Sequence, residues 1–297
     1  MYWALALMDF ANFMKILICT NGKKHSEEAI RFAGNLFSTF EPKITLLFIG
    51  QNSMGELAGR VGNEILGKFK LKADIKIKES RDIATEIVKE AEVGAYDLLV
   101  LGSRGASSTI PGVSNYVLGD IPREVIKEVK VSTLIVKEPE EVEKVLIAVN
   151  GSEASREAAL FWGLVAEKNK RKWREQKIHL VTVVPELYNQ FSDELGPLAK
   201  EQLDALSRVS NEYTRPAYQI KMALHEKHGV ESRVRLREGE ISEEILQEAD
   251  RDYDLIVLGR DETKRHTFGT HLASIVEQAE IPVLVVRRDT IKKAEHY

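Results

Sequence analysis

Glycines at two turns of the sequence have the spacing of a phosphate-binding site. The segment GSRG at residues 102–105 follows directly on an apolar run, and Gly119 and Asp120 stand just before a helical pattern at residues 122–129. Glycine lets the backbone approach a ligand closely, and free amides at a helix start attract an anion. These turns therefore predict a phosphate site, with Arg104 adding a positive charge. Glycines that only make tight turns remain the alternative.

Other catalytic and metal-binding patterns are missing from the sequence. Neither G-x-x-x-x-G-K-[ST] nor G-x-S-x-G occurs. Asp120 alone has the chemistry of a general base or metal ligand beside the phosphates. His225 and His228 lack a carboxylate or cysteine at a usual ligand spacing, so they are interpreted as surface histidines. The single cysteine, Cys19, lies in an apolar run, which predicts a buried, inert thiol and excludes an intramolecular disulfide.

These turns belong to a unit that the chain contains twice. Residues 15–33 match 144–162, residues 96–105 match 253–262, and residues 126–139 match 276–289. Because both the motifs and their order recur, the sequence indicates a duplication. The second copy has gained length before its fourth strand, mainly in residues 186–229. Helical periodicity there predicts longer helices on the sheet face, and a partner-binding surface is the alternative.

Short β-branched runs alternate with amphipathic segments in each copy. In the first copy the predicted strands are residues 16–20, 44–49, 75–79, 98–102 and 133–137, and the predicted helices include 26–37, 83–93 and 122–129. Continuous apolar strands are typical of a parallel sheet buried on both faces. With right-handed crossovers, the fold class is α/β, with two tandem doubly wound parallel-sheet domains of flavodoxin- or Rossmann-type layering. Ligands bind such sheets beyond the carboxyl ends of the strands, so the loops at 20–24 and 102–120 form the predicted site.

Length and composition indicate two globular domains. The chain has 297 residues, of which 43% are hydrophobic and 30% charged. The predicted division is a leader or mis-assigned start at 1–13, a first domain at 14–138, a linker at 139–143, a second domain at 144–289 with an insertion at about 186–229, and a tail at 290–297. The leader is too short to span a bilayer, and Met14 is a candidate start. A net charge of -4 argues against a nucleic-acid partner, and with one cysteine and no membrane span the prediction is a cytoplasmic protein.

The chain resembles the universal stress protein family in its tandem two-domain form. The resemblance lies in VLIAVNGS at 145–152, YDLIVLG at 253–259 and IPVLVV at 281–286, and it covers nearly all of residues 15–288. It implies two universal-stress-like domains, each an adenine-nucleotide-binding-like unit with a five-stranded parallel sheet. In ATP-binding members, adenosine lies near an aspartate after the first strand and the phosphates lie on the glycine loop.

The resemblance assigns the family's nucleotide-binding positions to specific residues of the first copy. By position, the residues on the adenosine side would be Thr20, Asn21 and Ile49, and those facing the phosphates would be Gly102, Gly105 and Gly119, with Arg104 and Asp120 beside them. The implied cofactor is ATP or another adenine nucleotide, with Mg²⁺ if Asp120 holds a metal.

The first copy departs from the family pattern at each of these turns. Asparagine replaces the aspartate at Asn21, as it does at Asn150 in the second copy, so a neutral hydrogen bond of roughly 1 kcal/mol remains. Thirteen residues instead of nine separate Gly105 from Gly119. Asp120 replaces a serine or threonine, and a carboxylate about 4 Å from a phosphate is repelled by a few kcal/mol at an effective dielectric of about 20. Either a divalent metal lies between them, or the carboxylate turns away, or the ligand is not a triphosphate.

The second copy departs further. Gly259 remains, but Glu262 stands at the second glycine position, and six residues separate it from Gly269. A side chain and a negative charge there oppose close contact with a phosphate, so the second domain is predicted to be degenerate. The basic residues at 264–266 are interpreted as a solvated loop.

Together these features predict a non-catalytic cytoplasmic stress-response protein, regulated by ATP or AMP bound in the first domain and acting on unknown protein clients. The two copies are expected to pack as an intrachain pseudo-dimer through their last strands, which are sheet edges, and a homodimer remains open. The alternatives are a nucleotide-independent adaptor or scaffold that uses residues 186–229, and a weak nucleotide hydrolase that uses Asp120.

Overall fold

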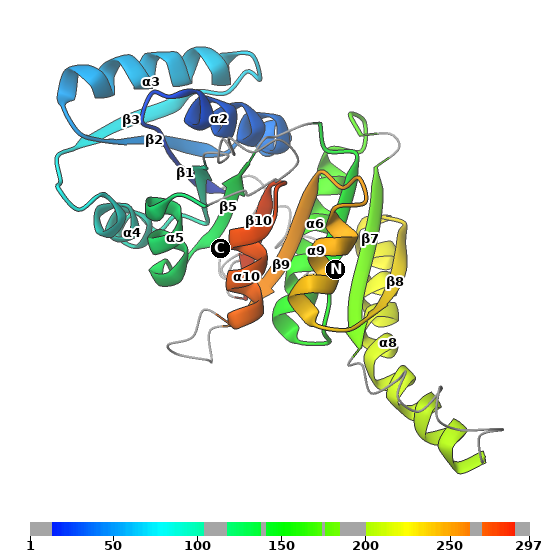
Figure 1. Cartoon of the computed structure of the whole chain (residues 1–297). Coiled ribbons are helices and arrows are strands. Elements are labelled where there is room, and N and C mark those ends of the chain that lie inside the picture. Colours follow the sequence, from blue (N-terminus) through cyan, green and yellow to red (C-terminus); the bar gives the residue numbers. More distant parts are fainter. Residues whose placement is uncertain are drawn as a thin grey trace.

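The computed structural model describes residues 14–103, 118–137, 141–173, 176–184, 200–261 and 269–288, with the backbone alone for 200–213. Two α/β domains follow one another along the chain (Figure 1). The first contains β1 (Lys15–Cys19), α2 (Lys24–Phe37), η1 (Ser38–Phe40), β2 (Lys43–Ile49), α3 (Asn52–Gly67), β3 (Ala73–Lys78), α4 (Ile83–Val93), β4 (Leu98–Gly102), α5 (Asp120–Glu128) and β5 (Ser132–Val136). The second contains β6 (Lys144–Ala148), α6 (Glu153–Lys168), β7 (Lys177–Val184), α8 (Lys200–His228), β8 (Ser232–Glu238), α9 (Ile241–Ala249), β9 (Leu255–Arg260), α10 (Thr270–Gln278) and β10 (Val283–Arg287).

Within the described residues, the strands of both domains form one ten-stranded sheet in the order β3-β2-β1-β4-β5-β10-β9-β6-β7-β8. Neighbouring strands run parallel inside each domain, whereas β5 and β10 pair antiparallel, with Ile135 opposite Val283 and Thr133 opposite Val285. The predicted packing of the two copies through their last strands is therefore confirmed. This pairing covers one edge of each half of the sheet and leaves β3 and β8 as its outer edges.

Helices cover both faces of this sheet, as a doubly wound fold requires. Helices α2, α3, α6 and α8 contribute to the core on one face, and α4, α5, α9 and α10 to the cores on the other (Figure 1). On the first face, one hydrophobic core runs through both domains and contains the fully buried Phe37 and Trp162. On the second face, Ile126 and Ile135 of the first domain pack into a core made mostly by the second domain. The domains thus share their cores as well as their sheet.

The strands and helices predicted for the first copy are confirmed, with ends shifted by at most two residues. Helix α3 turns a face that includes Gly55, Gly59 and Gly62 toward the sheet. A Cβ atom on Gly59 would lie 2.6 Å from Ile75 Cδ1, so the helix can lie this close to β3 only without a side chain there.

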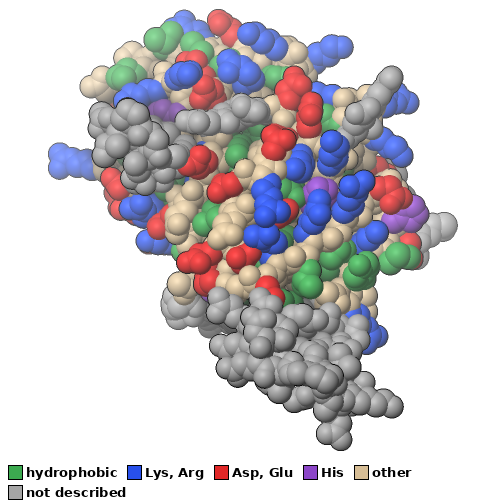
Figure 2. Space-filling model, turned by 45° about the vertical axis from the view of Figure 1, so that its right-hand side comes forward, with side chains coloured by type: hydrophobic (Ala, Val, Ile, Leu, Met, Phe, Trp, Pro, Cys, Tyr) green, Lys and Arg blue, Asp and Glu red, His purple; other side chains and the backbone are tan. Residues whose placement is uncertain are grey.

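The insertion of the second copy contains one long helix in the place that α3 has in the first. Helix α8 has 29 residues with Pro216 inside it, against 16 residues for α3, and its N-terminal half runs past the edge of the sheet (Figure 1). Residues 186–199, the rest of the predicted insertion, lie outside the described residues. Among the helices of the described residues, none has both the length and the apolar character needed to cross a membrane. The face in Figure 2 mixes Lys and Arg side chains with Asp and Glu side chains, as the near-neutral composition predicts.

Candidate functional site

The turn after β1 is a hydrogen-bonded frame at the carboxyl end of the sheet. Thr20 Oγ1 lies 3.2 Å from the Oγ atom of Ser26, which is in the first turn of α2. Asn21 Oδ1 accepts a hydrogen bond from the backbone N–H of Lys23 at 3.1 Å, and its Nδ2 lies 3.2 Å from His25 Nε2. The side chain of Asn21 therefore stabilises the turn, while its oxygen keeps a further lone pair for a ligand.

The two described glycines of the predicted phosphate site have different structural roles. A Cβ atom on Gly102 would lie 2.3 Å from the backbone oxygen of His25, so the end of β4 can contact α2 only through a glycine. Gly119 is the N-cap of α5 with φ -60° and ψ 154°, and its Cβ atom would meet Pro122 Cδ at an ordinary 3.7 Å. Neither glycine has a positive φ. Close backbone approach thus explains Gly102, whereas the described packing does not require glycine at 119.

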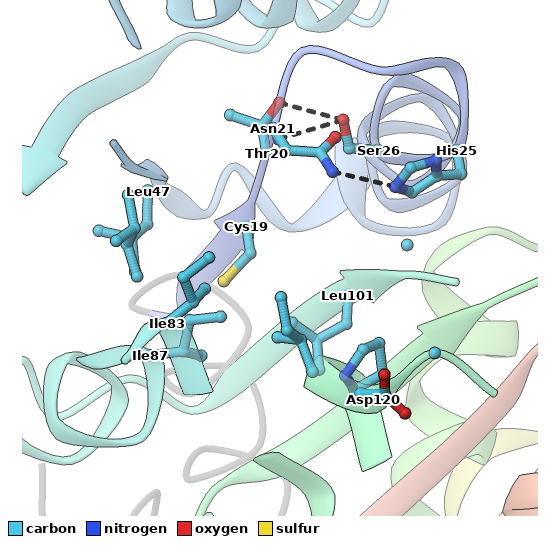
Figure 3. Close-up of a pocket in the computed structure, with 15 residues that line it drawn as sticks. Cys19, Thr20, Asn21, His25, Ser26, Leu47, Ile83, Ile87, Leu101 and Asp120 are labelled. Atoms are coloured by element: carbon cyan, nitrogen blue, oxygen red, sulfur yellow. Dashed lines mark hydrogen bonds between the residues drawn. The ribbon is translucent and has the colours of Figure 1, made fainter. Parts of the chain in front are cut away.

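These elements surround a cleft of about 380 Å³ at the carboxyl ends of β1 and β4. The predicted site residues that line it, drawn in Figure 3, are Thr20, Asn21, Ile49, Gly102, Gly119 and Asp120. Arg104 and Gly105, also predicted, lie outside the described residues. The fold therefore brings together residues that are up to 100 positions apart in the sequence, from the ends of the three strands β1, β2 and β4 and the start of α5.

Sequence reasoning missed the apolar wall of this cleft, which comes from Cys19, Leu47, Ile83, Ile87 and Leu101 (Figure 3). Part of this wall follows from the register of the parallel strands β1 and β2, in which Cys19 lies opposite Leu47. Cys19 is partly exposed at the wall instead of fully buried. Burial of its sulfur, and to a smaller degree the charge of Glu90, raise the pKa of Cys19, so the thiol stays protonated and unreactive.

Among the described residues, the charge of the cleft comes from the first turn of α5. Asp120 begins this helix and is exposed to solvent. It is the one carboxylate among the described residues that line the cleft, and no described lysine or arginine lines it. The amides of a helix start favour an anion, but this carboxylate opposes one, so the cleft suits a ligand of low net negative charge better than a highly charged one.

Comparison with known proteins agrees with this fold. A model of the universal stress protein family matches residues 12–137 and again residues 141–287. The chain belongs to the universal stress protein family. Universal stress protein MJ0531 of Methanocaldococcus jannaschii is 31% identical over an alignment of 146 residues, with 43% of this chain and 84% of that protein covered.

Two solved structures match this universal stress protein over both domains. A universal stress protein from Archaeoglobus fulgidus DSM 4304 is 19% identical and has a TM-score of 0.68, with 92% of this chain and 98% of that chain covered. The functionally unknown protein PA1789 from Pseudomonas aeruginosa PAO1 is 16% identical and has a TM-score of 0.63, with 97% of both chains covered. At these identities the similarity establishes the fold.

The second universal stress domain keeps the turn after its first strand but packs a different helix against it. Asn150 Oδ1 accepts hydrogen bonds from Ser152 N at 3.1 Å and from Ser152 Oγ at 2.7 Å. Gly151 has a φ of +78°, and a Cβ atom there would lie 3.0 Å from Pro216 of α8. In the first domain, the corresponding neighbour is Ala58 of α3, at 3.4 Å from the Cβ position of Gly22. The bulkier Pro216 thus packs more tightly against the turn at Gly151 than Ala58 does against the turn at Gly22.

A side-chain contact joins the starts of α9 and α10 in the second domain. His271 Nδ1 lies 2.8 Å from Glu240 Oε1, and Ser242 Oγ donates hydrogen bonds to both carboxylate oxygens of Glu240. The backbone N–H of Glu243 is the main reason that the pKa of Glu240 is lowered. The first domain has Ile121 at the position of His271. Glu262 and the basic residues at 264–266 lie outside the described residues.

No group of three or more histidine, cysteine, aspartate or glutamate side chains that could hold a metal ion occurs in the described part of the chain. His225 Nδ1 lies 2.8 Å from Glu231 Oε1 on the surface. The interpretation of His228 as a surface histidine is wrong, because α8 folds against α6 and buries it with its Nδ1 atom 2.8 Å from Glu167 Oε2. Burial lowers the pKa of His228, and the contact with Glu167 opposes this shift.

Proposed function

We propose that this chain is a non-catalytic stress-response protein whose action depends on an adenine nucleotide bound in the first-domain cleft. The observation that carries the proposal is the cleft itself, where an apolar wall and a hydrogen-bonded turn face the first turn of α5 across about 380 Å³. Small-molecule sites typically have volumes of about 300–1,000 Å³ and combine apolar walls with a few placed polar groups.

Each part of a nucleotide has a suitable surface in this cleft. The base would lie against the apolar wall that includes Leu47 and Ile83, and the ribose would lie near the polar side chains of Thr20 and Asn21. A phosphate would lie at the start of α5, where helix amides without intrahelical partners attract an anion.

The carboxylate of Asp120 favours nucleotides with few phosphates. Two charges about 4 Å apart interact by about 1 kcal/mol in water and by about 4 kcal/mol at an effective dielectric of about 20. Asp120 is exposed, so the smaller value applies. We expect affinity to fall from AMP to ATP in the absence of Mg²⁺, and Mg²⁺ to reduce this difference by placing a cation between the carboxylate and the phosphates.

The second domain would not bind a nucleotide in this manner. Pro216 packs against the turn at Gly151, and His271 at the start of α10 contacts Glu240, whereas the corresponding residue of α5 is Ile121. In the sequence, Glu262 replaces a glycine of the phosphate loop. One bound nucleotide per chain is therefore expected.

Isothermal titration calorimetry of the full chain with AMP, ATP and adenosine, each with and without Mg²⁺, tests this proposal. Other universal stress proteins have been solved in complex with cAMP and, from Archaeoglobus fulgidus, with dAMP, so both compounds join the panel. Saturation at one site per chain is the expected result. Absence of heat with every compound, together with no nucleotide in mass spectra of the purified protein, would exclude nucleotide regulation.

A matched pair of variants assigns the binding to the first domain. Asp120→Asn should tighten ATP binding about five-fold, which corresponds to removal of about 1 kcal/mol of repulsion, and should leave adenosine binding unchanged. Thr270→Val changes the corresponding residue of α10 and should leave both affinities unchanged. A response of nucleotide binding to the Thr270 variant, but not to the Asp120 variant, would place the site in the second domain.

A nucleotide-independent adaptor is the second candidate function, and α8 is the observation that favours it. This helix continues past the sheet edge for about half its length, unlike α3 in the first domain (Figure 1). If a partner protein binds α8, shortening residues 186–215 should abolish that complex and leave nucleotide affinity intact. A complex with the same affinity in the shortened chain would rule out this role for α8.

A further inference from the structure

Helix α5 connects the first-domain cleft to the second domain. Its N-cap Gly119 and its first-turn residues Asp120 and Ile121 line the cleft. Its other end lies at the domain boundary, where Ile126 packs into the core formed mostly by the second domain. A helix of nine residues is about 14 Å long and moves as one unit. Whatever holds its C-terminal end therefore also sets the position of its first turn.

Two arginines of the second domain hold that C-terminal end. Arg260 Nη1 donates a hydrogen bond to the backbone oxygen of Ile126 at 2.8 Å, and its Nη2 donates to that of Lys127 at 3.1 Å. Arg287 Nη1 donates to the backbone oxygen of Val129 at 2.8 Å. The last carbonyls of a helix have no partner within it, and cations are favoured at this negative end of the helix dipole. The contacts therefore fix α5 against the second domain.

The first domain makes a reciprocal contact with α10. Lys137, the counterpart of Arg287, donates hydrogen bonds from its Nζ atom to the backbone oxygens of Val276 and Ala279, both at 2.6 Å. The counterpart of Arg260 in the first domain is the neutral Ser103. Two guanidinium groups of the second domain thus contact the end of α5, and an ammonium group of the first domain contacts the end of α10. An ion pair between Arg123 Nε and Glu277 Oε1, at 3.1 Å, also joins the two helices.

We propose that Arg260 and Arg287 are positioning residues of the first-domain site, which hold α5 so that its first turn meets a phosphate group. This inference rests on the proposed nucleotide function of the first-domain cleft. The second domain then contributes to binding without touching the ligand. We expect the effect to be larger for phosphate-bearing ligands, because the amides of the first turn of α5 would meet the phosphate, whereas Leu47 and Ile83 of the apolar wall come from other elements.

Calorimetric titration of the full chain with AMP and with adenosine tests the assignment. Arg260→Ala is the main variant, since Arg260 is only partly buried and its loss leaves Arg287 in place. We expect this variant to bind AMP about five-fold more weakly, in the usual range of coupling between sites, and to bind adenosine as the unmodified chain does. Arg260→Lys should recover part of the loss, because one carbonyl contact can be remade. Hydrogen exchange of the α5 amides, measured without ligand, should be faster in Arg260→Ala.

Lys137→Met is the matched control, because it removes the reciprocal contact on α10 and should leave AMP affinity unchanged. Equal weakening of AMP and adenosine in Arg260→Ala would mean a general structural role and would overturn the assignment, as would unchanged binding of AMP. If the unmodified chain binds neither AMP nor adenosine, the proposed function itself fails. If it binds both and only the variant result is negative, the positioning role alone fails.

Discussion

Replacing Lys137 by methionine should change how the stability of this universal stress protein depends on pH. The side chain of Lys137 is fully buried at the domain boundary, where its Nζ atom donates hydrogen bonds to the backbone oxygens of Val276 and Ala279, both at 2.6 Å. Burial lowers the pKa of Lys137 from its ordinary value of 10.5 to about 7, and the charges of Glu277 and Glu280 oppose this shift. The native state therefore loses this proton more readily than the unfolded chain.

The direction and size of the effect follow from proton linkage. Between pH 7 and pH 10.5 the unfolded chain holds the proton of Lys137 while the native chain has released it, so the free energy of unfolding rises with pH in this window. The limiting slope is about 1.4 kcal/mol per pH unit, which gives a gain of about 2 kcal/mol between about pH 7 and pH 9. Well below pH 7 the group is protonated in both states and contributes no pH dependence.

Urea denaturation, followed by the fluorescence of the buried Trp162, measures this contribution at intervals from pH 6 to pH 9. The free energy of unfolding of the unmodified chain minus that of Lys137→Met should grow by about 2 kcal/mol from pH 7 to pH 9, whatever its value at pH 7. The control is Lys130→Met, which removes a lysine that is 71% exposed and should give a constant difference. A difference that stays constant or shrinks for Lys137→Met would refute the proposed deprotonation of the buried amine.

Two further substitutions test the local packing of the first and second domains, both by urea denaturation. Gly102→Ala should lower the free energy of unfolding by about 1–3 kcal/mol, because its methyl group would overlap the backbone oxygen of His25. The control Gly67→Ala, which has open space around it, should leave the free energy of unfolding unchanged. Equal stability of the two variants would contradict this explanation. Ser152→Ala should lower the free energy of unfolding by about 1 kcal/mol, because Ser152 Oγ accepts a hydrogen bond from the backbone N–H of Ser155 at 3.2 Å. Lys23 is the N-cap of α2 but makes no side-chain hydrogen bond there, so Lys23→Ala should leave the free energy of unfolding unchanged. A similar loss in both N-cap variants would show that the serine hydroxyl is not responsible.

The sequence was sufficient for the fold and for half of the cleft. The internal repeat predicted two copies of one unit, and the apolar strand runs predicted parallel sheets covered by helices. In such a sheet the carboxyl ends of neighbouring strands lie at the same edge, so the turns at Thr20 and Gly102 were expected close together and lie on one cleft. The apolar wall from Leu47 and Ile87 was missed, because a buried hydrophobic residue and a cleft-lining one have the same pattern along the chain.

What the sequence by itself determined is therefore the local order of strands, turns and helices, together with the edge of the sheet where a ligand would bind. The tertiary structure decided which ends of these elements meet across the domain boundary. It buries His228 against α6, and it places Lys137 and Arg287 at helix ends about 140 to 160 residues away along the chain. Such contacts leave no periodic signal, because a single cation that binds backbone carbonyls is chosen by geometry and not by the residue types that supply those carbonyls.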